Sequence, residues 1–301
     1  MKKYINYWLG IMLLAFISAS CSEDDLNGQS IFEDDLQMEK NKFDHWLDAN
    51  YLDPYNVEFK YRMEDVEIDF GKNLVPIKYE QAVQLARIIK HAWFELYDEV
   101  AGIEFTRTYV PKMIHLVGSY SYNPNGTITL GTADSGMKVT LFGGNWLNPK
   151  DIPFLNEYYF KTMHHEFSHI LHQNKDYPTE YRTLSEGHYS PSGWTNRHSM
   201  ADYAPYGFVT AYGSSEPGED IAEMTACFLT WSDKEWEKLK EGTKVDADGK
   251  PVQGGWEIIQ HKLELMKKYM MTSYGIDMDK LRDANRRRCD ELLRMNLDEL
   301  P

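Results

Sequence analysis

A ten-residue segment at 164–173, HHEFSHILHQ, contains side chains that can bind zinc and move protons. Within it, His165, Glu166 and His169 form an HExxH pattern. Residues four apart lie one turn apart on the same face of a helix, so the two imidazoles can bind one Zn²⁺. Glu166 lies about 100° further round the helix, where it can accept a proton from water attacking a carbonyl. The segment predicts one zinc ion per chain, bound by both histidines, with Glu166 as the base.

The HExxH pattern leaves the third ligand open, and His172 is the nearest candidate. It extends the pattern to HExxHxxH, but it lies seven residues after His165, which is about 10.5 Å along a helix axis. One ion cannot span that distance while it also binds His169. We therefore expect His172 to support the site from outside the set of ligands.

A second acidic segment, YGSSEPGEDIAEMTACF at 212–228, offers two carboxylates. Glu219 and Glu223 are four residues apart on a helix that we expect to begin near Pro217, with Ser215 as a candidate cap. Apolar neighbours make Glu223 costly to bury without a partner. One carboxylate can bind the metal while the other orients an imidazole, and the spacing alone does not say which.

Together, HEFSH and YGSSEPGEDIAEMTACF resemble the catalytic core of lethal-factor-like gluzincin endopeptidases. The resemblance implies that Glu219 is the third ligand and that Glu223 is an outer partner of an imidazole. Glu223 stays the runner-up ligand, because Pro217 departs from the family pattern and can shift the helix. The resemblance also implies that Tyr212, seven residues before Glu219, donates a hydrogen bond to the oxyanion of the transition state. Ser168, where glycine is common in the family, is compatible with a helix.

The first residues have the pattern of a secretory signal peptide. Lys2 and Lys3 precede an apolar run at 7–17 and small residues at 18–20. The run is too short for a comfortable membrane-spanning helix. Small residues followed by Cys21 resemble a bacterial lipobox, which implies that Cys21 is lipidated. The acids that follow resemble the export tag of Bacteroidetes surface lipoproteins, which implies an outer-membrane lipoprotein facing the cell exterior.

The whole chain resembles the substrate-import-associated zinc metallohydrolase lipoproteins, whose genes neighbour outer-membrane nutrient-import systems. The resemblance implies a peptide or protein substrate and an outer-membrane nutrient-import complex as a partner. The alternative is a non-catalytic zinc-containing binding lipoprotein of that complex, and the many aromatic residues leave a carbohydrate-binding module as a third reading. Glu166 favours an enzyme, because a purely structural zinc site has no need of a base at that position.

The helices and strands expected along the chain, which must position these residues, indicate an α+β fold. Apolar spacing predicts helices at 43–47, 79–97, 154–173, 217–231, 233–241, 254–273 and 278–296, and strands at 57–70, 112–117 and 128–142. We expect a zincin-like domain: a small mixed sheet, a metal-binding helix and a mostly helical C-terminal part. Val139 to Leu141 is the candidate edge strand beside the cleft, and 177–212 is expected to be a long loop region.

The expected organisation has three parts. Residues 1–20 form the signal peptide, 21–38 a lipidated acidic tether, and 39–301 the metallohydrolase domain, with a helical subdomain from about 213. A net charge of −15 opposes nucleic-acid binding and docking on anionic lipid, so we expect membrane contact through the lipid anchor only. Cys227 lies among apolar residues and is expected to be a buried free thiol.

Overall fold

The structure is a computed structural model that describes residues 39–63, 71–124, 126–134 and 137–300. Residues Lys42–Pro301 form one compact unit. The predicted signal peptide, Cys21 and the predicted tether lie outside the described residues. Within the described ranges, no helix combines the length and the apolar character that crossing a membrane requires.

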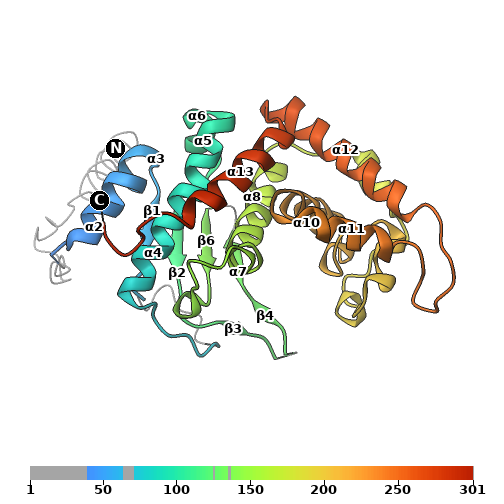
Figure 1. Cartoon of the computed structure of the whole chain (residues 1–301), viewed down its shortest axis with the longest axis horizontal. Helices are drawn as coiled ribbons and strands as arrows, with labels where there is room; N and C mark the ends of the chain where they lie inside the picture. The colour runs from blue at the N-terminus through green and yellow to red at the C-terminus, as the bar shows by residue number, and fades with distance from the viewer. Residues whose placement is uncertain (1–38, 64–70, 125, 135–136, 301) are drawn as a thin grey trace, which may run out of the picture. The chain divides into compact units, whose positions relative to one another are not determined.

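A four-stranded mixed sheet lies at the centre of this unit (Figure 1). Its order is β1 (Glu58–Lys60), β2 (Met113–Leu116), β6 (Lys138–Leu141) and β5 (Gly131–Asp134). The first three strands are parallel, and β5 runs antiparallel to β6. The prediction that Val139 to Leu141 is an edge strand is wrong, because β6 pairs on both sides and β5 lies at the edge.

The predicted strand at 128–142 is in fact three strands. Its first part, β4 (Ile128–Thr129), pairs with β3 (Ser121–Tyr122) in a separate hairpin. The turn in this hairpin contains Gly126, which has a φ of +83°, a conformation that glycine adopts without steric cost. Of the predicted strand at 57–70, only β1 is described as a strand, and 64–70 lie outside the described residues.

The predicted helices are present, and several are continuous with short π-helical turns. One rod contains α4 (Tyr79–Ile89), η3 (Lys90–Phe94) and α5 (Glu95–Ala101). A second contains α7 (Ile152–Leu155), η5 (Asn156–Phe160) and α8 (Lys161–Asn174). The remaining α-helical and π-helical elements are α2 (Lys42–Leu47), η1 (Asp48–Leu52), α3 (Asp53–Tyr55), α6 (Ile103–Tyr109), α9 (Thr179–Thr183), α10 (Pro217–Thr230), α11 (Asp233–Gly242), α12 (Gly255–Tyr274) and α13 (Met278–Leu292).

Short 3-10 helices occupy much of the region that was expected to be a long loop. They are η6 (Trp194–Asn196), η7 (Met200–Asp202), η8 (Ala204–Tyr206) and η9 (Tyr212–Ser214), and a further one, η4 (Gly144–Trp146), follows β6. The cap predicted for α10 is wrong: Glu216, not Ser215, is the N-cap residue, and it makes no side-chain cap hydrogen bond. Pro217 opens the helix, since its missing N–H would have no intrahelical partner there.

The hydrophobic core joins the sheet to the α8 rod. Apolar side chains of β2 and β6 meet Met163 and Phe167 of α8 around a small gap. Phe167 also packs edge-on against Trp93 of η3 and Tyr97 of α5, with ring centroids 5.1 and 4.8 Å apart. Because aromatic rings in this arrangement bury large areas, α8 is held rigidly against both the sheet and the first rod.

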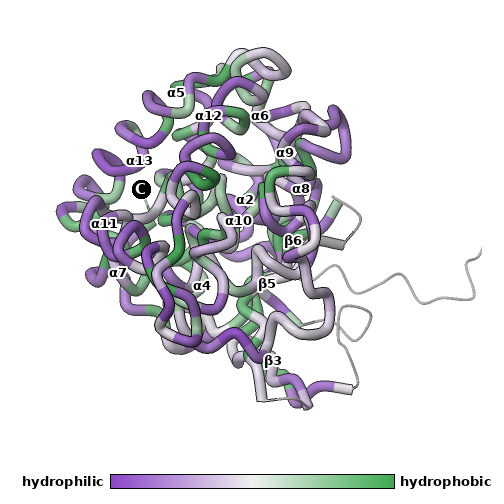
Figure 2. The backbone as a smooth tube through the Cα atoms, turned by 90° about the vertical axis from the view of Figure 1, so that its right-hand side faces the viewer, coloured by the Kyte–Doolittle hydropathy of each residue, from purple (hydrophilic) through white to green (hydrophobic). Residues whose placement is uncertain are grey.

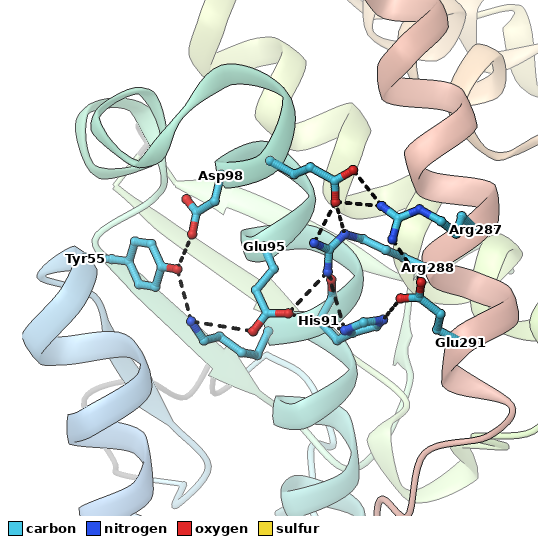
Figure 3. A network of polar contacts seen from close by, with 9 residues as sticks. Tyr55, His91, Glu95, Asp98, Arg287, Arg288 and Glu291 are labelled. Carbon is cyan, nitrogen blue, oxygen red and sulfur yellow. Dashed lines mark hydrogen bonds and ion pairs between the residues drawn. The ribbon is translucent and has the colours of Figure 1, made fainter.

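Charged side chains hold α13 against the outside of the first rod (Figure 3). Arg287 and Arg288 both reach Glu99, and Arg288 also reaches Glu95. Figure 2 shows α11 and α13 as largely hydrophilic segments, so each packs against the core through a narrow stripe. Single surface ion pairs add little stability, but a network that shares carboxylates fixes the position of the helix more firmly.

Candidate metal centre

Two helices, α8 and α10, supply the residues of the predicted site, and their side-chain contacts pair them in opposite directions. His169 of α8 reaches Glu219 near the start of α10, while His165, one turn earlier on α8, reaches Glu223, one turn later on α10. At the far end, Asn156 of η5 donates to the carbonyl of Thr230. This antiparallel packing brings the HExxH segment and the acidic segment together over their whole length.

Three potential ligand atoms converge between these helices. Nε2 of His165 and Nε2 of His169 are 3.1 Å apart, and Oε2 of Glu219 lies 2.9 and 3.2 Å from them. In a tetrahedral zinc site with bonds of about 2.0–2.1 Å, two ligand atoms are about 3.3 Å apart. Two imidazoles and a carboxylate at this spacing fit a zinc ion, and they leave a fourth position for water or substrate.

Burial and charge have opposite effects on the pKa values of His165 and Glu219. Burial alone would lower the pKa of His165, but Glu219 and Glu223 outweigh it and raise the pKa to about 10. Burial would raise the pKa of Glu219, yet hydrogen bonds from the two histidines lower it to about 2. The site without metal therefore favours an imidazolium beside a carboxylate, and a metal cation would replace that proton.

Glu223 lies behind His165, away from the converging atoms. Its Oε1 is 2.9 Å from Nδ1 of His165, and its Oε2 is 3.0 Å from Nζ of Lys161. The carboxylate is buried, and Lys161 and His165 hold its pKa below the usual range despite that burial. An ionised carboxylate in this place fixes the tautomer and the orientation of the imidazole, which is the usual role of an outer partner of a metal ligand.

His172 occupies the corresponding place behind His169. Its Nε2 lies 2.8 Å from Nδ1 of His169, so it contacts the outer nitrogen of that ring and not the converging atoms. Burial, together with His169, lowers the pKa of His172 to about 4, so the ring is neutral near pH 7. The structure therefore places His172 outside the cluster, as the helix-rise argument predicts. His164 faces the core, where its Nδ1 lies 3.0 Å from the hydroxyl of Tyr97.

Tyr212 and Glu166 lie beside the cluster. The Tyr212 ring stacks on His165 at 5.7 Å and meets Trp194 edge-on at 4.9 Å. Burial raises the pKa of Tyr212, and so does a hydrogen bond from its hydroxyl to Glu219, so the phenol keeps its proton. Glu166 is half-buried and close enough to raise the pKa of both His165 and Tyr212. Both side chains can thus approach a reacting group at the cluster.

The structure also contains a buried ion pair that the sequence does not indicate. Asp220, next to Glu219, lies 2.6 Å from Nζ of Lys262 on α12, and both side chains are fully buried. Tyr189 donates to the same carboxylate at 2.8 Å. Lys262 is 42 residues away in sequence, so spacing could not reveal the pair. The pair connects the start of α10 to α12, and so it fixes the helix that carries Glu219.

Comparison with known proteins assigns the family. A family model described as "putative zinc-binding metallo-peptidase" matches residues 35–279. The chain belongs to this family. A crystal structure with the same description, from Bacteroides caccae, is 48% identical to the chain. That match covers 90% of this chain and 100% of the other, with a TM-score of 0.76. Among curated proteins, none matches the chain.

Membership of the zinc-binding metallo-peptidase family agrees with the site geometry. The converging side chains of His165, His169 and Glu219 all lie within the matched span. Together, the family and the cluster indicate zinc as the metal. The predicted α+β fold is also confirmed, because the related crystal structure has the same fold.

Proposed function

We propose that the protein is a zinc peptidase of the gluzincin type that hydrolyses peptide bonds at the cell surface. The observation that carries the proposal is the convergence of His165, His169 and Glu219, with Glu166 and Tyr212 beside them. A structural zinc site needs four filled positions and no neighbouring base. Three protein ligands with an adjacent carboxylate and phenol instead suit hydrolysis.

In this proposal each side chain has one task. Zinc at the cluster would polarise the scissile carbonyl and lower the pKa of a water molecule there. Glu166 would accept the proton of the attacking water and pass it to the leaving amine. Tyr212, which keeps its proton, would donate a hydrogen bond to the oxyanion as it forms. Glu223 and His172 would hold the two imidazoles in position.

The edge strand β5 supports a polypeptide substrate. It packs on α8, because a Cβ at Gly131 would lie 2.4 Å from Cγ2 of Thr162, one turn before Glu166. Among the described strands, β5 pairs only with β6, so its other edge can pair with an extended chain. A peptide bound there would pass directly over the start of the HExxH segment.

The experiment compares the zinc-loaded wild type with Glu166→Gln on a broad peptide library. Glu166→Gln keeps volume and helix but removes the proton acceptor, so it should bind zinc and cleave nothing. Tyr212→Phe should lower kcat about 100–1,000-fold with little change in substrate binding. Equal cleavage by Glu166→Gln would refute the mechanism. A zinc-loaded wild type that cleaves no peptide would favour the non-catalytic binding lipoprotein.

We further propose that Cys21 carries a lipid anchor, that the protein is an outer-membrane lipoprotein, and that it acts beside a nutrient-import complex. The support is the apolar run, the small residues before Cys21 and the acids after it. Mass spectrometry of the N-terminus from membrane fractions tests the anchor. A Cys21→Ala protein that still fractionates with membranes would contradict it. Crosslinking in intact cells, followed by identification of an importer subunit, tests the partner.

A further inference from the structure

Five aromatic side chains gather beyond the start of the metal helix, and they are called the aromatic platform below. They are Tyr120, Tyr122, Trp146, Phe154 and Tyr158. We propose that the aromatic platform binds an aromatic or apolar side chain of a peptide substrate, about four residues after the scissile bond. This inference rests on the proposed peptidase function and adds a substrate preference to it.

The rings of the aromatic platform are held in place by contacts with one another and with the backbone. Tyr120 stacks on Trp146 at 5.0 Å and meets Tyr158 at 5.9 Å. The Tyr120 ring also lies against the backbone of Gly143, where an added Cβ would come within 2.2 Å of it. Trp146 and Tyr122 nevertheless keep 54% and 61% of their surface exposed. The half-buried ring of Tyr120 therefore holds the two exposed rings in place, which lowers the entropic cost of binding a ligand.

The aromatic platform is continuous with the candidate active site. Glu166, Thr162 and Tyr158 follow one another at four-residue spacing along the α8 rod, so they lie on about the same face. Thr162 abuts Gly131 at the start of β5. The β3–β4 hairpin, which carries Tyr122, lies at the end of the sheet where β5 begins, because one residue separates β4 from β5. A chain laid along β5 thus leads from Glu166 to the aromatic platform.

The spacing sets the position of the subsite. Tyr158 lies eight residues before Glu166, which is about 12 Å along a helix. An extended peptide covers that distance with about four residues, at roughly 3.3 Å each. Since β5 follows the hairpin in the chain and runs away from it, a peptide that pairs antiparallel to β5 would run towards the hairpin. The residues after the scissile bond therefore reach the aromatic platform.

The structure favours a peptide over a glycan as the ligand of the aromatic platform. Aromatic faces stack on sugars as well as on side chains, so the rings alone do not distinguish them. The strand edge that leads to the aromatic platform does, because its backbone N–H and C=O groups pair with another polypeptide. An aromatic pair of this kind changes affinity by up to about tenfold.

The first test uses peptides built on a cleaved sequence, with Phe or Ser placed at each of the six positions after the scissile bond. Wild type should prefer Phe by about tenfold in kcat/KM at the third to fifth position, and Trp146→Ala should lose this preference. Met271→Ala, which removes a similarly exposed apolar side chain on α12, should keep the preference. A preference that survives in both Trp146→Ala and Tyr122→Ala would overturn the proposal.

A binding measurement separates this proposal from the proposed catalysis. Glu166→Gln should bind the Phe peptide about tenfold more tightly than the Ser peptide, and the added Trp146→Ala should remove the difference. This result would support the aromatic platform even if wild type cleaved nothing. Equal binding of both peptides would overturn it. Trp146-dependent binding of maltoheptaose that the Phe peptide does not compete with would also overturn it, in favour of a glycan surface.

Discussion

Two buried carboxylates on α10, Asp220 and Glu223, lie three residues apart and each is paired with a lysine. Glu223 faces α8, where Lys161 and His165 bind it at 3.0 and 2.9 Å. Asp220 faces α12, where Lys262 binds it at 2.6 Å. Lys262 is fully buried, whereas the Lys161 side chain is 23% exposed.

The two pairs give α10 two separate roles, one in the stability of the fold and one at the metal site. The Asp220 pair contacts no converging ligand atom, so its effect on the metal passes through the position of α10. The Glu223 pair contacts an imidazole of the cluster directly, so it acts on the charge and orientation of that ring. A change in the Asp220 pair should therefore mainly affect the free energy of unfolding. A change in the Glu223 pair should mainly affect zinc affinity.

The largest effect is expected from Lys262→Met. The substitution leaves the Asp220 charge buried without its partner, which should lower the free energy of unfolding by about 3–5 kcal/mol. Denaturant unfolding of the metal-free protein measures it. Lys280→Met is the control, since its ion pair with Asp277 is exposed and should contribute less than about 1 kcal/mol. Equal losses in both variants would contradict a special role for the buried pair.

A pH series tests the charge on the Glu223 side. Zinc needs a neutral imidazole, and the raised pKa of about 10 means that His165 without metal holds a proton throughout pH 7–9. Zinc affinity should therefore rise by about tenfold per pH unit across that window. An ordinary histidine would be neutral there and would give no such slope. Competition with a chromophoric chelator measures the affinity, and a constant value from pH 7 to 9 would exclude the raised pKa.

Glu223→Gln should weaken zinc binding by about 10–100-fold, because the imidazole loses an ionised outer partner. It should also flatten the pH series, since the carboxylate helps to raise the pKa of His165. The matched control is Glu157→Gln, which removes an exposed carboxylate one turn before Lys161. If both variants bind zinc as the wild type does, Glu223 has no part in the metal site.

The smallest effect is expected from His172→Phe. This variant keeps an aromatic ring against Tyr177 but removes the nitrogen that faces Nδ1 of His169. Hydrogen bonds to neutral partners are about half as strong as those to charged ones, so zinc affinity should fall by less than tenfold. The same chelator competition measures it. A loss larger than that of Glu223→Gln would reverse the ranking of the two outer partners.

The sequence was most informative where local spacing decides the geometry. Helix rise was enough to predict that His172 lies outside the cluster, and the structure places it there. Four-residue spacing put Glu219 and Glu223 on one face, but only the resemblance to gluzincin endopeptidases implied that Glu219 meets the HExxH histidines. Strand order was not predictable in the same way. The alternation of apolar and polar residues in 138–142 is compatible with an edge strand and with an interior strand. The prediction therefore placed the edge strand at 139–141, whereas β5 is the strand at the edge.

Long-range partners were also missed. Lys161 and Lys262 are ordinary lysines in sequence, and only the packing of α8, α10 and α12 makes them partners of buried acids. The anchor at Cys21 lies outside the described residues and stays a prediction. The prediction that Cys227 is a buried free thiol is confirmed.

The π-helical turn η5, which joins α7 to the metal helix, has a consequence for how the gene can change. A π turn holds one residue more than an α turn, so losing one residue between Asn156 and Phe160 restores a regular helix. That deletion would rotate everything before it by about 100° relative to α8. Phe154 would lose its place against Tyr158, while the HExxH segment kept its own register. Length variation at this single turn could therefore remake the far end of the substrate path and leave the metal chemistry intact.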